Sequence, residues 1–183
     1  MRIAVVGDIH GDIDCLKSAL DDLKTKNIDA VFSTGDLVDT EQNAKEIISL
    51  CRQGRVISVK GNHDEMAAES SRCDPYSRAY LAGLPFSFDF NVFGWRITIL
   101  HGSHGKNTEY LYADSLLTQQ FLENADDNSI LVCGHTHIPY IINHGLVYVM
   151  NPGSVTRPKA PATPSYLLLE LTPSGLDCNL IEL

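Results

Sequence analysis

Short apolar runs alternate with segments of helical periodicity in the first half of the chain. The apolar runs predict buried strands at residues 2–6, 30–33 and 55–59. Each run is followed by a polar loop and then by helical spacing of apolar residues, which predicts helices at about 13–23 and 41–52 and a short helix after residue 64. Repeated strand–helix units are typical of an α/β protein, in which loops at the carboxyl ends of the strands converge on one crevice.

The second half of the chain favours hairpins. Alternating apolar and polar residues predict paired strands at 86–90 and 95–100, and an apolar run predicts a buried strand at 129–133. Two further hairpins are expected at 139–149 and 166–183, and two further helices at 73–82 and 113–123. We therefore predict a single α/β domain over residues 1–183, in which two mixed sheets pack face to face with helices outside.

The composition is that of an ordinary globular protein with an acidic surface. Hydrophobic residues make up 44% and charged residues 20%, and the formal net charge is −9. Such a charge repels long nucleic acid and acidic membrane, so neither is expected as a partner.

The sequence predicts neither a signal peptide nor a membrane span. The apolar start at 3–6 is too short for a signal peptide, and no stretch approaches the roughly 18 apolar residues that a membrane span needs. The five cysteines form no CxxC pair, so we expect reduced thiols in a cytoplasmic protein, either monomeric or homo-oligomeric.

Polar residues with metal-binding side chains follow most of the predicted strands. In chain order they are Asp8, His10, Asp36, Asn62, His63, Asp64, His101, His135 and His137. Each by itself is also explained as a helix cap, a turn residue or a buried strand-end histidine. Unrelated turns, however, have no reason to place so many such groups at the same strand ends. Oxygen and imidazole groups without thiolate suit Mn, Fe, Zn or Ni rather than a structural zinc site.

The spacing of His135 and His137 is compatible with two ions or with one. In an extended segment, residues two apart point to the same side, about 6.5 Å apart along the chain. Two imidazoles at that spacing would serve two neighbouring ions, whereas a bent chain would bring both to one ion.

Five short motifs occur in order along the chain. They are Asp8-Ile9-His10, Gly35-Asp36 with Asp39, Gly61-Asn62-His63-Asp64, His101-Gly102 and Gly134-His135-Thr136-His137. In these motifs the sequence resembles the calcineurin-like metallophosphoesterases. Its short length and the Asn151-Pro152-Gly153-Ser154 loop look most like the small bacterial and archaeal phosphodiesterases of that family. The resemblance runs from residue 2 to about residue 155 and implies the family's four-layer αββα sandwich.

The resemblance also implies a centre of two divalent metal ions. By position, the ligands of one ion would be Asp8, His10, Asp36 and His137. The ligands of the other would be Asp36, Asn62, His101 and His135, so that Asp36 bridges the pair. Mn²⁺ is the metal most expected, with Fe, Zn or Ni as alternatives. The implied reaction is hydrolysis of a phosphodiester or a phosphomonoester by in-line attack of a metal-bridging hydroxide, with His63 as general acid and Asp64 orienting its imidazole.

Two other functions of the same fold stay open at this point. The retromer subunit of this fold is a protein-binding scaffold with an impaired catalytic set, whereas no ligand position is missing here. The family's protein phosphatases carry Asp-Arg-Gly where this chain has Asp39-Thr40-Glu41, which weakens the phosphoprotein hypothesis. Asp39 is expected to contact the metal ligands rather than the metal itself. His104 and Arg157 are expected to contact either substrate or solvent. A small phosphate ester is the expected substrate.

Overall fold

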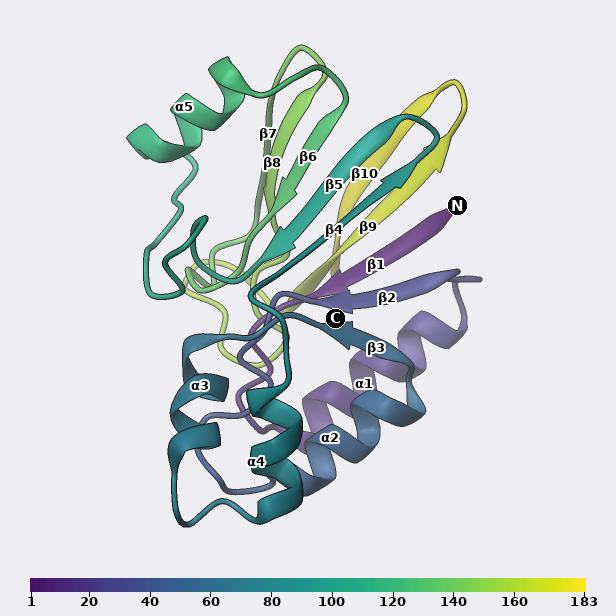
Figure 1. Ribbon diagram of the computed structural model, residues 1–183. Helices are drawn as coiled ribbons and strands as arrows, with labels where there is room; N and C mark the ends of the chain where they lie inside the picture. The colour runs from purple at the N-terminus through teal and green to yellow at the C-terminus, as the bar shows by residue number, and fades with distance from the viewer.

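Two five-stranded mixed sheets form the centre of the computed structural model, which describes residues 1–183 (Figure 1). The first sheet has the order β10 (Gly175–Glu182), β9 (Ser165–Thr172), β1 (Arg2–Val6), β2 (Ala30–Ser33) and β3 (Val56–Ser58). The second has the order β4 (Ser87–Val92), β5 (Trp95–Leu100), β6 (Ser129–Val132), β8 (Val147–Asn151) and β7 (Tyr140–His144). Strands β1, β2 and β3 run parallel, as do β5, β6 and β8, and the remaining pairings, β1–β9, β9–β10, β4–β5 and β7–β8, are antiparallel.

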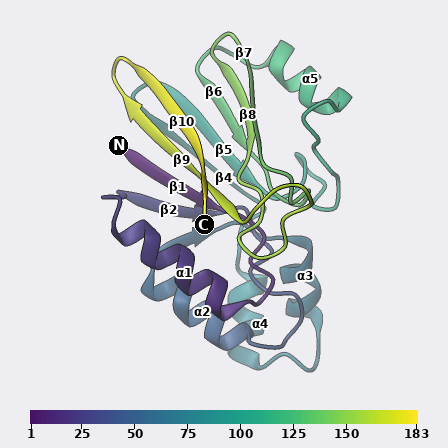
Figure 2. The same ribbon diagram turned by 180° about the vertical axis from the view of Figure 1, so that it is seen from behind.

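Five helices cover the outer faces of the two sheets (Figures 1 and 2). They are α1 (Ile13–Lys24), α2 (Ala44–Gln53), α3 (Asn62–Glu69) and α4 (Pro75–Ala82) on the side of the first sheet, and α5 (Leu116–Asn124) on the second. One apolar cluster lies between the first sheet and its helices, one between the sheets and one under α5. This is a four-layer αββα sandwich, so the predicted fold class is confirmed. None of the helices has the length and apolar character needed to cross a membrane.

Strand β1 is apolar from Ile3 to Val6 because both faces of the strand are covered there. Side chains alternate across a strand, so Ile3 and Val5 enter the cluster between the sheets while Ala4 and Val6 enter the cluster under the helices. Facing β1 across the sandwich, β5 and β6 contribute apolar side chains to the same central cluster. The short apolar run at the start of the chain therefore marks the centre of the first sheet.

Element boundaries depart from the predicted ones at two places that matter for the site. Helix α2 starts at Ala44 rather than near residue 41, because Asn43 has a left-handed backbone, with φ 62°, that ends the preceding turn. Helix α3 starts at Asn62, so Asn62, His63 and Asp64 form its first turn instead of a loop before it. The predicted hairpins β4–β5, β7–β8 and β9–β10 are confirmed.

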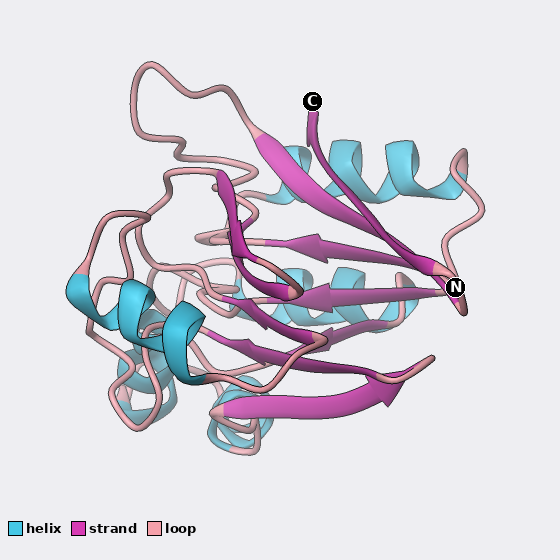
Figure 3. Ribbon diagram, turned by 90° about the horizontal axis from the view of Figure 1, so that it is seen from above, coloured by secondary structure: helices cyan, strands magenta, loops and turns pink.

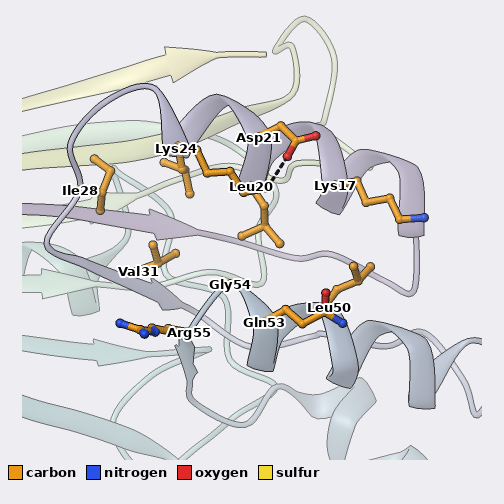
Figure 4. A pocket seen from close by; sticks show the side chains of 11 residues that line it. Lys17, Leu20, Asp21, Lys24, Ile28, Val31, Leu50, Gln53, Gly54 and Arg55 are labelled. Carbon is orange, nitrogen blue, oxygen red and sulfur yellow. Dashed lines mark hydrogen bonds and ion pairs between the residues drawn. The ribbon is translucent and has the colours of Figure 1, made fainter.

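A cavity of about 300 Å³ lies between α1 and α2, next to the start of β2 (Figure 4). Its floor is apolar, and Lys17, Lys24 and Arg55 lie around it. A Cβ atom on Gly54 would lie 2.8 Å from Leu20 Cδ2, so α1 packs closely on the end of α2 and a larger residue there would displace the Leu20 side chain. This cavity lies at the amino end of β2, whereas the polar motif residues follow the carboxyl ends of the strands.

The loops that follow β1, β2, β3, β5 and β6 meet at one edge of the sandwich. Figure 3 shows loops gathered at this end of the strands, on the left of the view. Backbone hydrogen bonds tie them together: His10 N donates to Asp36 O over 2.9 Å, and Gly134 N donates to His101 O over 2.9 Å. The parallel arrangement therefore brings segments from distant parts of the sequence to one place.

Candidate metal centre

The first group of candidate ligands joins the loop after β1 to the loop after β6. His10 Nε2 lies 3.1 Å from His137 Nε2, and His137 Nε2 lies 3.4 Å from Asp8 Oδ1. The ligand atoms of these three residues all lie within 4.8 Å of one another. Two imidazole nitrogens and a carboxylate oxygen thus face a common point.

The second group includes Asp36 and lies beside the first. His101 Nε2 lies 2.9 Å from Asn62 Oδ1, 3.1 Å from His135 Nδ1 and 3.4 Å from Asp36 Oδ2. Asp36 Oδ2 also lies 3.8 Å from His10 Nε2 of the first group. One carboxylate oxygen therefore stands between the two groups, at the position implied for a bridging ligand.

The chemistry of these groups fits divalent cations. Asp8, Asp36 and His101 are almost fully buried, and Asp8 Oδ2 has no hydrogen-bond partner. A buried carboxylate oxygen without a donor is costly unless a cation meets it. Oxygen and nitrogen donors without sulfur match Mn, Fe, Zn or Ni. The clustered His and Asp groups are thus consistent with a dinuclear metal site.

Burial shifts the pKa values of the buried groups in the metal-free chain. Desolvation, with the nearby Asp64 and Asp8 carboxylates, raises the pKa of Asp36 to about 9. Desolvation lowers the pKa values of His10 and His101 to about 4, so both imidazoles are neutral at pH 7 and have lone pairs available for a metal. The Asp36 carboxyl is protonated at that pH and must lose its proton to bind a cation.

Metal affinity is therefore expected to rise with pH. The metal-free Asp36 carboxyl has a pKa of about 9, so metal binding must release its proton. Each increase of one pH unit between pH 7 and 8.5 should therefore raise the apparent Mn²⁺ affinity by up to about tenfold, and one proton should be released for each Asp36 that binds metal. Calorimetric titration in two buffers of different ionisation enthalpy measures the proton release. An affinity that stays constant over this range would contradict the prediction.

Several candidate ligands have an unusual backbone conformation. Left-handed φ values occur at Asp8 (49°), His10 (47°), Asp36 (50°), His135 (65°) and His137 (59°). Such conformations cost about 1–3 kcal/mol each in a residue other than glycine and occur often at functional sites. The surrounding structure must hold them in place.

Buried side chains from the Asn-Pro-Gly-Ser loop hold these turns. Ser154 Oγ donates to the carbonyl oxygen of Asp8 over 2.7 Å, and Asn151 Nδ2 donates to the carbonyl oxygen of Gly134 over 2.8 Å. The Nδ1 atom of His101 lies 2.9 Å from Thr34 O, and that of His137 lies 2.8 Å from Arg157 O. Since a carbonyl only accepts, each Nδ1 donates and leaves the Nε2 lone pair toward the site.

The His135–His137 pair differs from the extended arrangement considered for it. Both residues are left-handed, and the chain turns between them. His135 joins the second group while His137 joins the first. The two imidazoles still serve two neighbouring positions, but a sharp turn rather than strand alternation separates them.

The predicted orientation of His63 by Asp64 is wrong. Asp64 is fully buried and accepts from the backbone N–H groups of Gly61, over 2.9 Å, and Val38, over 3.2 Å. It caps α3 and joins the loop after β2 to the loop after β3. The His63 ring faces Asp39 instead: its Nδ1 lies 3.0 Å from Asp39 O and 3.3 Å from Asp39 Oδ1. Asp64 sits at the third position of the helix, where its carboxylate turns back to the backbone.

Glycine is required where the two loops touch. A Cβ atom on Gly61 would lie 2.0 Å from Asp36 Oδ1, so no other residue fits without moving Asp36. His63, in the first turn of α3, completes the contact, because its N donates to Asp36 Oδ1 over 2.9 Å. One carboxylate oxygen of Asp36 is thus fixed by the backbone, and the other faces the candidate ligands.

Tyr110 contacts the site although no motif marked it. Its ring stacks on the His135 ring, with centroids 4.1 Å apart and planes 14° apart, and its other neighbour is the Tyr112 ring at 5.6 Å. An aromatic residue in an irregular loop gives no sequence signal for such a contact. The stack restricts the His135 ring, whose Nδ1 belongs to the second ligand group.

Replacing Tyr110 with alanine is expected to weaken metal binding at the second group. A lost aromatic pair is worth about 0.5–1.5 kcal/mol, which corresponds to a twofold to tenfold loss of affinity. Titration of the metal-free protein with Mn²⁺ measures the change. Tyr112→Ala serves as the matched control, since Tyr112 stacks on Tyr110 and not on His135. Equal losses in both variants would contradict the assignment.

The two remaining candidates take different positions. The Arg157 guanidinium is held by Asp39, with Nη1 and Nη2 3.0 and 3.1 Å from the two carboxylate oxygens. This pair lowers the pKa of Asp39 and so keeps its carboxylate charged beside His10 and His63. His104 is exposed and belongs to neither ligand group.

Known proteins are similar to this chain in sequence and in fold. A protein of Methanocaldococcus jannaschii without an assigned function is 27% identical over 192 residues, which span 86% of this chain and 77% of the relative. The phosphodiesterase YfcE of Escherichia coli is 24% identical over 182 residues, spanning 93% of this chain and 88% of that protein. The crystal structure of a metallophosphoesterase from Sphaerobacter thermophilus superposes with a TM-score of 0.79 at 24% identity, covering 100% of this chain and 89% of that one.

This two-sheet sandwich, with His and Asp groups clustered at the carboxyl ends of its strands, is a metallophosphoesterase by family membership. Residues 1–174 match the calcineurin-like phosphoesterase superfamily domain. The chain belongs to the calcineurin-like phosphoesterase superfamily.

Proposed function

We propose that this chain hydrolyses phosphodiesters of small molecules, and phosphomonoesters as a second class, with two divalent metal ions of which Mn²⁺ is the first choice. The observation that carries the proposal is that every predicted ligand belongs to one of two adjoining groups, with Asp36 of the second group 3.8 Å from His10 of the first. Two divalent ions in such a site would neutralise charge on the phosphate and lower the pKa of a water nucleophile.

The charge balance of the candidate ligands supports an anionic substrate. Asp8 and Asp36 are the two carboxylates among them, and the remaining ligands are neutral imidazoles and one amide. Two negative charges against the four positive charges of two divalent ions leave an excess of positive charge. A phosphate ester would be attracted to it, and the attraction grows as charge builds up on the phosphate oxygens.

The position of the His63 ring supports a role for this residue as the proton donor to the leaving oxygen. Its Nδ1 must donate to the carbonyl oxygen of Asp39, 3.0 Å away, because a carbonyl only accepts. The proton for the leaving alkoxide therefore comes from Nε2 of the imidazolium. The Asp39 carboxylate, 3.3 Å from Nδ1, would stabilise that charged form. The half-buried His63 side chain is still accessible to a substrate.

The test uses the full chain, stripped with a chelator and reloaded separately with Mn²⁺, Fe²⁺, Zn²⁺ or Ni²⁺. Bis(4-nitrophenyl) phosphate, 4-nitrophenyl phosphate and a phosphopeptide are offered to each preparation, and metal content is measured on the same samples. We expect the aryl diester to be hydrolysed by the Mn²⁺ form, with activity lost on chelation and restored on reloading. Metal-loaded protein that is inactive on a broad panel of phosphate esters would favour a protein-binding scaffold. Preference for the phosphopeptide would favour a phosphoprotein phosphatase.

A further inference from the structure

His135 lacks the hydrogen bond that orients two of the other candidate ligand histidines. In His101 and His137 the Nδ1 atom lies 2.9 and 2.8 Å from a backbone carbonyl oxygen, as is usual for the second nitrogen of a metal-binding imidazole. His135 instead turns Nδ1 toward the second ligand group, and its Nε2 is buried with no hydrogen-bond partner. Desolvation lowers the pKa of His135, and the Asp8 carboxylate and the Thr108 backbone oppose that shift, but neither meets Nε2 in hydrogen-bond geometry. Packing must therefore set the orientation of this ring.

The Tyr110 ring supplies that packing. It lies nearly parallel to the His135 ring, at 14° and with the centroids 4.1 Å apart. The Tyr110 side chain is itself 49% exposed, so its own burial is too small to hold it against the histidine. Its neighbour Leu111 is only 4% exposed and belongs to the apolar cluster under α5. The backbone of this segment must therefore hold the Tyr110 ring in place.

Two buried hydroxyl groups fix that backbone. Tyr140 Oη donates to the carbonyl oxygen of Leu111 over 2.7 Å. Thr118 Oγ1 donates to the carbonyl oxygen of the next residue, Tyr112, over 2.8 Å. Both donors are buried, and desolvation raises the pKa of Tyr140, so its hydroxyl keeps the proton that it donates. Two successive carbonyl groups are thus tied, one to β7 and the other to α5.

We infer that Tyr140 and Thr118 are positioning residues for the metal ion at the second ligand group. Neither donates a hydrogen bond to a candidate ligand. Both act through the backbone that carries Tyr110, whose ring restricts His135. The inference rests on the two-ion site of the proposed function and adds no chemical step to it. Because such coupling is reciprocal, an ion bound at His135 should in turn stabilise the segment from Tyr110 to Thr118.

Tyr140→Phe is the first test, because it removes the hydroxyl and keeps the ring in the apolar cluster. Calorimetric titration of the metal-free full chain with Mn²⁺ should show one of two binding steps weakened about threefold to tenfold, as expected for one lost buried hydrogen bond. The matched control is Tyr166→Phe, since that buried hydroxyl donates to Asp22 Oδ2 over 2.7 Å on the helix side of the first sheet. It should change neither step, whatever it does to the melting temperature. Thr118→Val removes the other hydroxyl and gives the same test where Tyr140→Phe does not fold.

A double variant shows whether the Tyr140 hydroxyl acts through the Tyr110 stack. In a Tyr110→Ala chain the stack on His135 is already gone, so adding Tyr140→Phe should cost less than about twofold in further Mn²⁺ affinity. A hydroxyl that only stabilised the fold would instead weaken binding equally in both backgrounds. Equal losses in the two backgrounds, or equal losses in Tyr140→Phe and Tyr166→Phe, would overturn the inference.

Hydrogen exchange gives a readout that does not depend on activity. Saturating Mn²⁺ should slow exchange of the amides at 110–119 in the wild type by at least about threefold, and this protection should be lost in Tyr110→Ala. Protection that survives in Tyr110→Ala, or its absence from a wild type with two ions bound, would overturn the inference. Hydrolysis of bis(4-nitrophenyl) phosphate in the same preparation measures the proposed function. A chain that shows the coupling without hydrolysing any ester would leave the inference standing, and a chain that binds no divalent ion would overturn both.

Discussion

Replacing Asp36 with asparagine is expected to cost at least about 10³-fold in kcat/KM and to leave the protein with fewer than two bound ions. Asparagine has nearly the same shape and still accepts from His63 N through its oxygen, but it lacks the charge that both ligand groups share. Loss of charge stabilisation worth several kcal/mol corresponds to this loss of rate. Elemental analysis and aryl diester hydrolysis on one preparation measure both effects.

The same substitution has an opposite expected effect on the metal-free fold. Burial and neighbouring carboxylates raise the pKa of Asp36 to about 9, so its ionised form is unfavourable when no cation is present. Asparagine removes that group, and the melting temperature of the metal-free variant should therefore equal or exceed that of the wild type. Asp127→Asn, at an exposed aspartate, is the control and should change neither metal content nor stability. An Asp36→Asn variant that bound two ions at wild-type affinity would contradict the shared-ligand role.

The sequence predicted the fold because its strands are either apolar on both faces or regularly alternating. Strand β1 is buried on both sides, and the β4–β5 hairpin alternates around a tight turn. Parallel order then followed from the strand–helix repeats, and the parallel order predicts which loops meet. The candidate ligands could be named from this placement, because a residue at a carboxyl strand end has few other places to lie.

Details that depend on backbone turns and on side-chain contacts could not be predicted. Left-handed conformations at Asp8 and His135 depend on hydrogen bonds and close packing from segments more than 100 residues away, such as the bond from Ser154 Oγ to Asp8 O. The resemblance implied that Asp64 orients the His63 imidazole, but Asp64 lies in the first turn of α3 and turns its carboxylate back to Gly61 N. Asp39 is 24 residues away from His63 and makes that contact instead. Tyr110 reaches His135 from a loop that carries no periodic pattern.

His63→Gln is expected to retain both metal ions while slowing the hydrolysis of alkyl esters about 10²–10⁴-fold. Only the His63 backbone N–H contacts Asp36 Oδ1, so the substitution leaves that contact in place. A 4-nitrophenolate leaves readily without a proton, whereas an alkoxide does not. The loss should therefore be much smaller for the aryl diester than for an alkyl diester, and this dependence on the leaving group distinguishes a proton donor from a group that only shapes the site.

The competing role for His63 is that of a metal ligand, since its ring nitrogen lies within 4.8 Å of ligand atoms of His10 and Asp36. Metal content separates the two roles, because replacing a ligand would also remove the ion that it binds.

Asp39→Asn is the companion variant: it keeps the backbone carbonyl that holds His63 Nδ1 but removes the carboxylate 3.3 Å from it. Without that carboxylate the proton donor loses its charged partner, so hydrolysis of the alkyl diester should slow more than that of the aryl diester, with metal content unchanged. Loss of an ion from His63→Gln, or an unchanged rate of alkyl diester hydrolysis in Asp39→Asn, would show that the imidazole serves the metals rather than the leaving oxygen.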